Sequence, residues 1–347
     1  MTPGTEPVAV ATGLKPLNRK RVFLESDPLA TASGSVPLIE VPDKTLTLPA
    51  FAKINLNLRV LGTRPDGYHE IDTVLQTISL HDTITVTATE SPEIVFSCDD
   101  PSLPTGSGNL VYRAAESLQA RFAPGKGARI WLEKRIPVQA GLGGGSADAA
   151  VALAALDHLW QTDAKSYQLL KIGNSLGSDV PFFFSGGTVR ATGIGSDLTV
   201  LPDGPDRFLL VVKPNASIAT TEAYKLLKAR SLTTVEAKTI LSSSERGEIS
   251  DCFNSKALQN DFELVAFQLE PEIERAKAAL MRAGAEAALL AGSGSAVFGI
   301  FDNRDAQARA IQMIELEAGW RVFPCRTLGR NPYRSAMGAA GEIFARF

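Results

Sequence analysis

The sequence predicts an α+β fold built from two domains. Segments with the alternating pattern of half-buried strands are interspersed with segments rich in helix formers, as in Arg129–Ile136 and the later Ala147–Trp160. The chain has 347 residues, which is long enough for two hydrophobic cores. A glycine-rich run lies between the strand and the helix just named. These observations give the fold class and the place where a site is expected.

The chain divides into four regions. Residues 1–46 carry scattered Pro, Thr, Ser and Gly without periodicity and lack the apolar core of a secretory signal, so a flexible extension is predicted. Residues 47–205 are predicted to form the first domain and residues 206–328 the second. Residues 329–347 are predicted to be a tail, because an Asn-Pro-Tyr turn and Gly-Ala repeats interrupt any pattern there.

Hydrophobic periodicity and composition predict the elements of each domain. In the first domain these are, in order, strands at Thr83–Thr87 and Ile94–Phe96, a helix at Asn109–Arg121, a strand at Arg129–Ile136, a helix at Ser146–Trp160 and a strand at Thr188–Ala191. In the second domain they are a strand at Phe208–Val212, helices at Thr221–Lys228 and Pro271–Ala283, and a strand pair within Ala288–Phe301.

Composition and charge exclude several classes of protein. Lys and Arg number 35 against 38 Asp and Glu, so no basic excess supports nucleic-acid binding. No stretch reaches the length of a membrane-spanning helix. Cys98, Cys252 and Cys325 are far apart and odd in number, which argues against a disulfide framework or a zinc site and for a reducing compartment. We therefore expect a cytoplasmic protein with no nucleic-acid partner, no membrane contact and no structural metal.

The run Pro137–Ser146 predicts a phosphate-binding loop. Four of the five residues in Gly141–Gly145 are glycine, which adopts backbone angles closed to other residues and lets successive N–H groups converge on an anion. A long helix begins here, with Ser146 as its expected N-cap, and the partial positive charge of its N-terminus favours a polyphosphate. A glycine turn without a ligand is the alternative, but it would weaken the chain entropically for no gain.

Two common phosphate-binding motifs do not fit this run. A Walker A loop has Gly-Lys-Ser/Thr before its helix, whereas Gly-Ser-Ala stands here. The dinucleotide fingerprint needs a glycine where Ser146 stands and an acidic strand end about twenty residues on, whereas Asp163 follows no strand pattern. The loop therefore belongs to another class.

Three motifs resemble, in the right order, those of the GHMP small-molecule kinases, which are named for galactose, homoserine, mevalonate and phosphomevalonate. Pro49–Leu58 resembles the first motif of the family, Pro137–Ala150 the second, and Leu290–Phe298 the third, which is also rich in glycine. The match spans about residues 47–328. The resemblance implies the two-domain GHMP kinase architecture, with an N-terminal ATP-binding domain and the active site in the interdomain cleft.

The resemblance also implies that ATP, with Mg²⁺, is the phosphate donor. Phosphoryl transfer needs mainly positioning and charge neutralisation. Asn109 corresponds to a position near the adenine, Lys134 lies on the strand that enters the loop, and Ser146 is expected near the phosphates or near Mg²⁺. The residues of the loop that are expected at ATP are Pro137, Gly141, Leu142, Gly143, Gly144, Gly145, Ser146 and Ala147.

Lys53 and Asp179 correspond to the lysine and aspartate that the family places at the acceptor hydroxyl. A carboxylate can take the proton of the hydroxyl, and a nearby ammonium spreads the negative charge that develops. Both residues also have structural interpretations, because an aspartate before Val-Pro is often a turn residue and a lysine in an apolar strand often extends its stem to solvent.

A further signature concerns the acceptor. Three segments are together similar to segments of family members that phosphorylate a cytidine diphosphate polyol: Gly62–Thr73, Leu176–Phe182 and Asn260–Glu263. Within the first segment, Tyr68 offers a ring on which cytosine can stack, and His69 can bind the polar edge of the base.

A structural role for these two side chains is the alternative, with Tyr68 packing in a turn and His69 merely exposed. Three more residues correspond to substrate contacts in the family: Asn55, Thr220 and Tyr224.

Several functional hypotheses follow. The first is a kinase for the cytidine diphosphate polyol, acting as a monomer or a homodimer. The second is a GHMP kinase for homoserine, mevalonate or a sugar, which Gly67–His69 argues against. The third is a nucleotide-binding regulator without catalysis, for which a missing lysine or base would be expected, although both are present. A dehydrogenase is a remote fourth.

Overall fold

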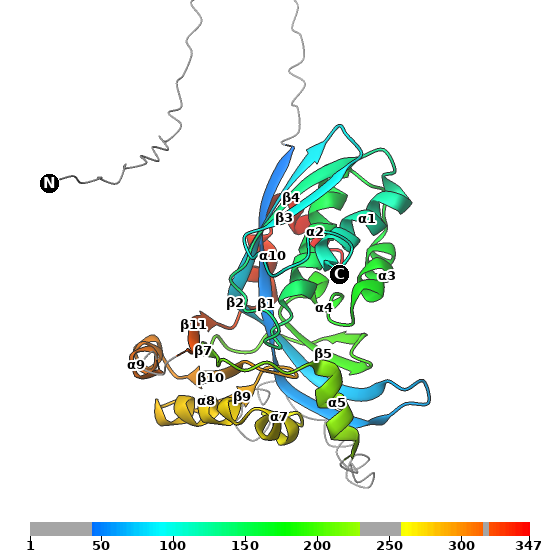
Figure 1. Ribbon diagram of the computed structural model, residues 1–347. Helices are drawn as coiled ribbons and strands as arrows, with labels where there is room; N and C mark the ends of the chain where they lie inside the picture. Colours follow the sequence, from blue (N-terminus) through cyan, green and yellow to red (C-terminus); the bar gives the residue numbers. More distant parts are fainter. Residues whose placement is uncertain (1–43, 230–257, 315–318) are drawn as a thin grey trace, which may run out of the picture. The chain divides into compact units, whose positions relative to one another are not determined.

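A long β-hairpin forms the centre of the larger sheet (Figure 1). Its strands, β1 (Thr45–Thr63) and β2 (His69–Thr89), pair antiparallel with three shifts of register. The computed structural model describes residues 44–229, 258–314 and 319–347. Residues 1–43 of the predicted extension therefore lie outside the described residues, and β1 begins within the last residues of that prediction.

Seven strands of the described residues form the larger sheet. Its main path runs β3 (Ile94–Cys98), β4 (Gly127–Glu133), β2, β1 and β8 (Gln259–Asn260). Two further strands extend it from β2: β5 (Thr188–Gly193) and β6 (Asp197–Val200). Because β2 is long, it pairs with β4 through Thr83–Thr89 and with β5 through Ile71–Gln76. β2 thereby joins the upper and the lower part of this sheet in Figure 1.

Helices from the first half of the chain gather on one face of this sheet (Figure 1). They are α1 (Leu110–Phe122), α2 (Gly144–Trp160), α3 (Ser166–Leu176) and α4 (Phe182–Ser185). α2 is buried on almost every side and packs against β1, β2 and α1, as its richness in Ala and Leu allows. It begins at Gly144, two residues before the predicted start, because Gly143 and not Ser146 takes the N-cap position.

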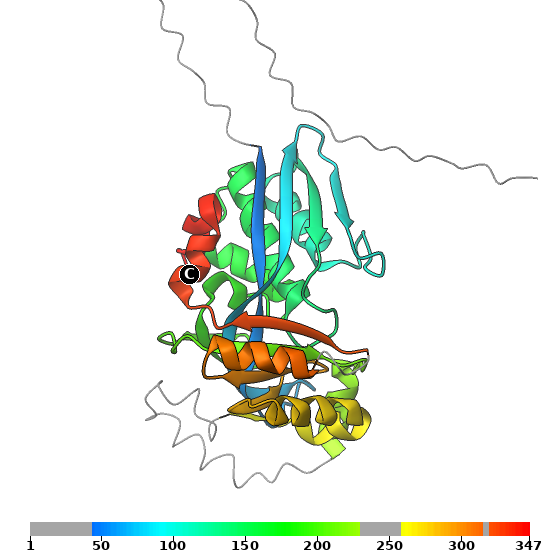
Figure 2. The same cartoon turned by 90° about the vertical axis from the view of Figure 1, so that its left-hand side faces the viewer.

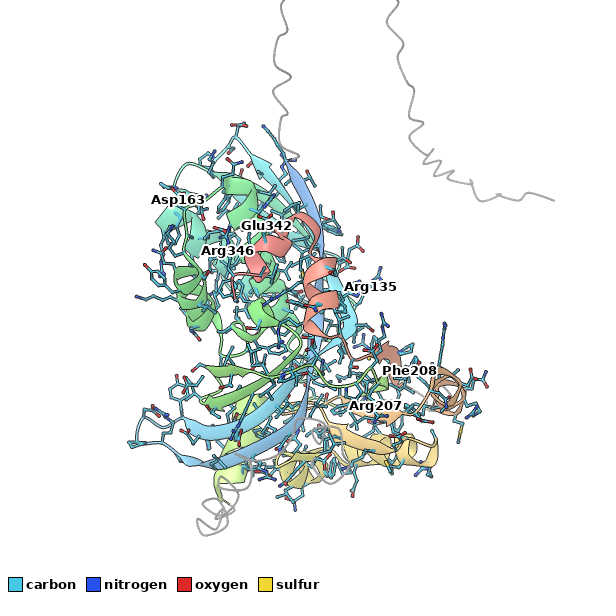
Figure 3. All side chains as sticks on the ribbon, turned by 180° about the vertical axis from the view of Figure 1, so that it is seen from behind. Arg135, Asp163, Arg207, Phe208, Glu342 and Arg346 are labelled. Carbon is cyan, nitrogen blue, oxygen red and sulfur yellow. The ribbon has the colours of Figure 1, made fainter. Side chains whose placement is uncertain are left out.

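The C-terminal segment differs from the predicted tail. It forms α10 (Arg330–Ala336), a 3₁₀ turn η2 (Gly338–Ala340) and α11 (Gly341–Phe344), which lie beside the helices of the first half (Figures 2 and 3). Tyr333 is fully buried, and its hydroxyl donates a hydrogen bond to the carbonyl of Phe183. These helices are too short for a periodic pattern to be visible in the sequence. Single buried aromatic rings anchor them to the rest of the protein.

Four strands in the described part of the chain form a second, antiparallel sheet. Their order is β11 (Arg321–Arg326), β7 (Phe208–Lys213), β10 (Val297–Phe301) and β9 (Ala287–Leu290). The described helices of this part are α5 (Thr220–Ala229), α7 (Glu263–Leu269), α8 (Pro271–Arg282) and α9 (Arg304–Ile314). α8 packs on β9 and β10, and α9 packs on β7 and β11 (Figure 2).

The two sheets share a core. Ile54 and Leu56 of β1 belong to the same buried cluster as Leu209, Val211 and Phe298 of the second sheet. Separate clusters lie under α2 in the first half and under α8 in the second. The α+β class is confirmed, and the described residues form one compact unit, within which the division at residues 205 and 206 stays a prediction.

Candidate active site

The glycine-rich loop joins β4 to α2 and turns sharply at Gly141 and Gly143. Their φ angles are +76° and +71°, a region that disfavours residues with a Cβ. A Cβ at Gly141 would lie 1.8 Å from the carbonyl oxygen of Ala291, and one at Gly143 would lie 3.0 Å from Cγ of Lys53. The loop therefore needs glycine both for its backbone angles and for its close approach to two other segments.

The N-terminus of α2 supplies the donors expected of a phosphate site. The bond from the N–H of Ala147 to the carbonyl of Gly143 measures 2.9 Å and opens the helix. The N–H groups of Gly144, Gly145 and Ser146 precede it and have no acceptor within the helix. Together with the glycine turns they form a concave set of donors at the positive end of the helix dipole, which fits a polyphosphate.

The third glycine motif packs directly against this loop. The N–H of Ala296 donates to the carbonyl of Ala140 at 3.2 Å, and the N–H of Ser295 donates to that of Gln139 at 3.4 Å. Gly292 has a φ of +55°, and a Cβ there would lie 2.8 Å from the carbonyl oxygen of Gly141. The two glycine motifs, which are about 150 residues apart in the sequence, thus form one surface.

Lys53 and Asp179 lie next to each other. Nζ of Lys53 is 3.6 Å from Oδ2 of Asp179 and donates to Oδ1 of Asn55 at 2.8 Å. Nδ2 of Asn55 in turn donates to Oγ1 of Thr73 at 2.8 Å. Because Lys53 and Asn55 are two residues apart on β1, they face the same side of the strand. The side chain of Lys53 is only 5% exposed, whereas that of Asp179 is 39% exposed.

The segment that carries Asp179 is firmly anchored. Asp179 lies between α3 and α4, in a turn closed by a 3.2 Å bond from the N–H of Val180 to the carbonyl of Gly177. Val180 and Phe182 on either side of Pro181 are fully buried. The turn also lies close to the first residues of α2, because a Cβ at Gly177 would lie 3.9 Å from Oγ of Ser146. The carboxylate is thus held beside both the lysine and the loop.

A cavity of about 380 Å³ contains these groups. Its walls come from the larger sheet, from the two glycine motifs and from the second half of the chain, and include Lys53, Asn55, Gly143, Asp179, Tyr224 and Gly292. A second cavity of about 790 Å³ shares Ser178, Ile194 and Tyr224 with the first. The two cavities therefore have a common wall, with the lysine–aspartate pair in one and Tyr68 and His69 in the other.

Three rings pack in sequence from the second cavity to the first, with Tyr224 of the common wall in the middle. The rings of His69 and Tyr224 are stacked with centroids 4.6 Å apart, and those of Tyr224 and Phe262 are nearly perpendicular with centroids 4.8 Å apart. Burial, with a smaller contribution from the charge of Asp179, raises the pKa of Tyr224 to about 12. The Tyr224 phenol therefore keeps its proton at neutral pH and can donate a hydrogen bond.

Tyr68 lies at the tip of the β1–β2 hairpin and is 62% exposed. The hairpin turn is held by bonds from the N–H of Arg64 to the carbonyl of Tyr68 at 2.8 Å and from the N–H of Tyr68 to Oδ1 of Asp66 at 3.1 Å. Gly67 has a φ of +86°, as this turn requires. Tyr68 is consequently not the buried turn aromatic of the alternative interpretation, and its ring is available to a ligand.

Two residues predicted at ATP have hydrogen-bond partners within the protein. Oδ1 of Asn109 accepts from the N–H of Val111 at 2.8 Å and caps α1. Nζ of Lys134 donates to Asp82 and, at 2.9 Å, to Asp148 beneath the loop. Burial acts to lower the pKa of Lys134, but the carboxylates of Asp148 and Asp82 together outweigh it and raise that pKa. Contacts of either residue with ATP remain predictions.

The other predicted residues fall in three places. Pro137, Leu142 and Ala147 are buried and can shape the loop but offer little side-chain surface to a ligand. Asn55 and Tyr224 line the first cavity, and their contacts with substrate stay a prediction. Thr220 is the first residue of α5, and its side chain lies outside the described residues.

Sequence reasoning missed several residues that organise the site. Lys134 is held by Asp82 and Asp148, and Asn55 is held by Thr73. Phe262 lies in the wall of the first cavity, and Asn260 lies behind that wall. Asp148 and Asn260 belong to motifs that carry the family resemblance. That resemblance indicated that the two residues matter but not what their side chains do. Thr73 ends the Gly62–Thr73 segment and so carried the same signal, whereas nothing in the sequence distinguishes Asp82 from other polar residues of a strand.

The described ranges hold no group of three or more His, Cys, Asp or Glu side chains placed to bind a metal ion. In the same ranges, no helix combines the length and the apolar composition needed to cross a membrane.

Comparison with known proteins identifies the relatives of this chain. Residues 109–187 match the GHMP kinases N terminal domain, and residues 244–318 match the GHMP kinases C terminal domain. The chain is 42% identical over 266 residues to the 4-diphosphocytidyl-2-C-methyl-D-erythritol kinase of Lachnoclostridium phytofermentans, which covers 76% of this chain and 91% of that protein.

Solved structures agree with this relationship. A crystal structure of 4-(cytidine 5'-diphospho)-2C-methyl-D-erythritol kinase is similar with a TM-score of 0.68 and 35% identity, covering 82% of this chain and 100% of that one. The homoserine kinase of Cytophaga hutchinsonii has a TM-score of 0.65 at 17% identity, covers 84% of this chain and 96% of that one, and shares the fold alone. The chain therefore belongs to the GHMP kinases and, within them, to the 4-diphosphocytidyl-2-C-methyl-D-erythritol kinase family.

Proposed function

We propose that the protein transfers the γ-phosphoryl group of ATP to the 2-hydroxyl of 4-diphosphocytidyl-2-C-methyl-D-erythritol, a step of the non-mevalonate isoprenoid pathway. The observation that carries this proposal is the 3.6 Å pair of Lys53 and Asp179 in a cavity bounded by the glycine loop. The 42% identity to a kinase of that name supports the choice of acceptor.

In this proposal Asp179 is the general base. Its carboxylate is exposed to the cavity, so an acceptor hydroxyl can reach it and transfer a proton to it as the new P–O bond forms. Lys53 stands beside it with its ammonium oriented by the bond to Asn55. A fixed positive charge at this point stabilises the carboxylate before the transfer and the negative charge that develops during it.

The phosphate donor is proposed to bind at the glycine loop. ATP supplies the phosphoryl group, and Mg²⁺ bound to its phosphates neutralises their charge. The groups that fit the phosphates are the N–H groups of Gly144, Gly145 and Ser146, which have no acceptor within the helix that begins there. The Ser146 hydroxyl is a candidate contact for the phosphates or for Mg²⁺.

The cytidine is proposed to bind in the second cavity. Tyr68 offers an exposed ring, and His69 and Tyr224 form a stacked pair in the wall of the same cavity. Aromatic rings of this kind bind a base through stacking, and an imidazole can bind its polar edge. The shared wall of the two cavities would then let one substrate reach from this ring group to the Lys53–Asp179 pair.

A panel of acceptors tests the proposal. We expect ADP release with MgATP and 4-diphosphocytidyl-2-C-methyl-D-erythritol, and ³¹P NMR should assign the new phosphate to the 2-hydroxyl. Homoserine and mevalonate should give no release above the rate without acceptor. Turnover of either of these, without turnover of the cytidine substrate, would assign the site to another GHMP kinase activity.

A further inference from the structure

The buried amide of Asn260 connects two parts of the active site. Asn260 is 4% exposed and lies in β8, which pairs with β1 at Leu58. Its Nδ2 donates to the carbonyl of Leu290 at 2.9 Å and to that of Gly292 at 2.7 Å. Because an amide nitrogen carries two hydrogens, these bonds use both of its donors.

The first part is the main chain beside Lys53. Gly292 adopts a φ of +55°, and a Cβ there would lie 3.2 Å from Nζ of Lys53 and 2.8 Å from the carbonyl oxygen of Gly141. The carbonyl that Asn260 binds thus belongs to the residue of the third glycine motif that reaches both the lysine and the phosphate loop. A shift of Gly292 would alter the space in which donor and acceptor meet.

The second part is the ring group of the acceptor site. Oδ1 of Asn260 accepts from the N–H of Phe262 at 3.0 Å. Phe262 meets the edge of Tyr224, which stacks on His69. The two ends of one side chain therefore hold the glycine motif next to Lys53 and the ring that backs Tyr224.

We infer that Asn260 is a positioning residue for phosphoryl transfer, which sets the third glycine motif and the ring group at a fixed distance from each other. This inference rests on the proposed kinase activity. Asn260 is absent from the walls of both cavities that carry the proposed acceptor site, so it acts through Gly292 and Phe262 and not by touching substrate. A displacement of reacting groups by about 1 Å costs on the order of 10²-fold in rate, so the effect on turnover is large.

Gln307 provides a matched control. It is also a buried amide, 7% exposed, and its Nε2 donates to two main-chain carbonyls, those of Leu209 at 2.6 Å and Cys325 at 2.9 Å. Both acceptors belong to the second sheet, and Gln307 lines neither of those two cavities. Asn260→Ala and Gln307→Ala therefore remove the same kind and number of donors. Asn260 lies behind the active site, whereas Gln307 lies away from it.

The experiment measures melting temperature, kcat and KM for ATP and for the cytidine substrate in the full-length protein. Both alanine variants should melt at a lower temperature than the wild type. Only Asn260→Ala should lower kcat, by about 10–100-fold, with KM for ATP within about threefold of wild type. An equal kcat for the two variants would overturn the inference, because loss of buried hydrogen bonds alone would then explain Asn260.

A second variant covers the case in which Asn260→Ala does not fold. Asn260→Asp keeps the size of the side chain and the acceptor for Phe262 while removing the amide donors to Leu290 and Gly292. A folded Asn260→Asp protein with kcat within twofold of wild type would contradict the inference, and a reduced kcat supports it. The wild type is assayed in parallel to separate the two claims. Absence of turnover in the wild type would refute the proposed function. An active wild type together with an equally active Asn260 variant would refute the inference alone.

Discussion

Lys134→Met is expected to destabilise the protein because it leaves two buried carboxylates without their cation. Nζ of Lys134 binds both Asp82 and Asp148, and the side chains of the three residues are 8%, 0% and 3% exposed. Methionine keeps the apolar stem of the lysine and removes the charge. Breaking a buried ion pair by removing one partner costs about 3–5 kcal/mol of unfolding free energy.

This loss converts into a measurable shift of the melting temperature. An unfolding entropy of ~2.1 cal/mol/K per residue gives roughly 0.7 kcal/mol/K for 347 residues. A loss of about 3–5 kcal/mol therefore lowers the melting temperature by roughly 4–7 °C. Differential scanning calorimetry, with KM for ATP measured on the same samples below the transition, provides the test.

Lys44→Met is the control for this experiment. Lys44 donates to Glu90 at 2.7 Å, but both side chains are exposed, so their pairing is screened by solvent and its loss should leave the melting temperature unchanged. An unchanged melting temperature for Lys134→Met, combined with a KM for ATP raised tenfold or more, would refute the reasoning. Lys134 would then be a direct phosphate contact and not a support beneath the loop.

Three further predictions concern the loop, the acceptor site and the buried cluster. Gly141→Ala should abolish ATP binding in calorimetric titrations or prevent folding, because its Cβ would lie 1.8 Å from the carbonyl of Ala291; near-normal affinity would show that the loop adjusts. Tyr68→Ala should weaken the cytidine substrate by about 1–3 kcal/mol and leave ATP binding unchanged, whereas equal losses for both ligands would indicate a structural role. Burial raises the pKa of Asp148 well above its usual range, so its protonated form stabilises the folded state at low pH and that stabilisation is lost as pH rises through the raised value. Asp148→Asn should therefore gain stability relative to wild type as pH rises in chemical denaturation, and a difference independent of pH would contradict this.

The parts of the site that the sequence predicts are those fixed by local chemistry or by motif. The glycine loop was recognisable because left-handed backbone angles and close approach to Ala291 leave glycine as the residue that fits. Lys53 and Asp179 lie far apart in the chain, and only the order of the family motifs indicated that they would meet. Their 3.6 Å separation agrees with that expectation.

The parts that sequence reasoning missed depend on partners that leave no mark in the sequence. Asn260 binds main-chain carbonyls about 30 residues away, and every residue has a carbonyl, so no pattern points to Leu290 or Gly292. Lys134 was predicted at ATP because it precedes the loop, but nothing in the sequence indicated that its side chain would bind Asp82, on another strand. The C-terminal helices were missed because a few buried rings, such as Tyr333, anchor them without periodicity.

The role of Asp179 is the central claim of this account, and the turnover of Asp179→Asn tests it most directly. Asparagine keeps the shape of the side chain but cannot take the acceptor proton, so kcat should fall by about 10²–10⁴-fold while the dissociation constant for ATP stays near the wild-type value. Asp163→Asn, at an exposed position outside both cavities of the proposed acceptor site, should retain wild-type kinetics. A correctly folded Asp179→Asn protein that turns over the cytidine substrate at the wild-type rate would contradict the account.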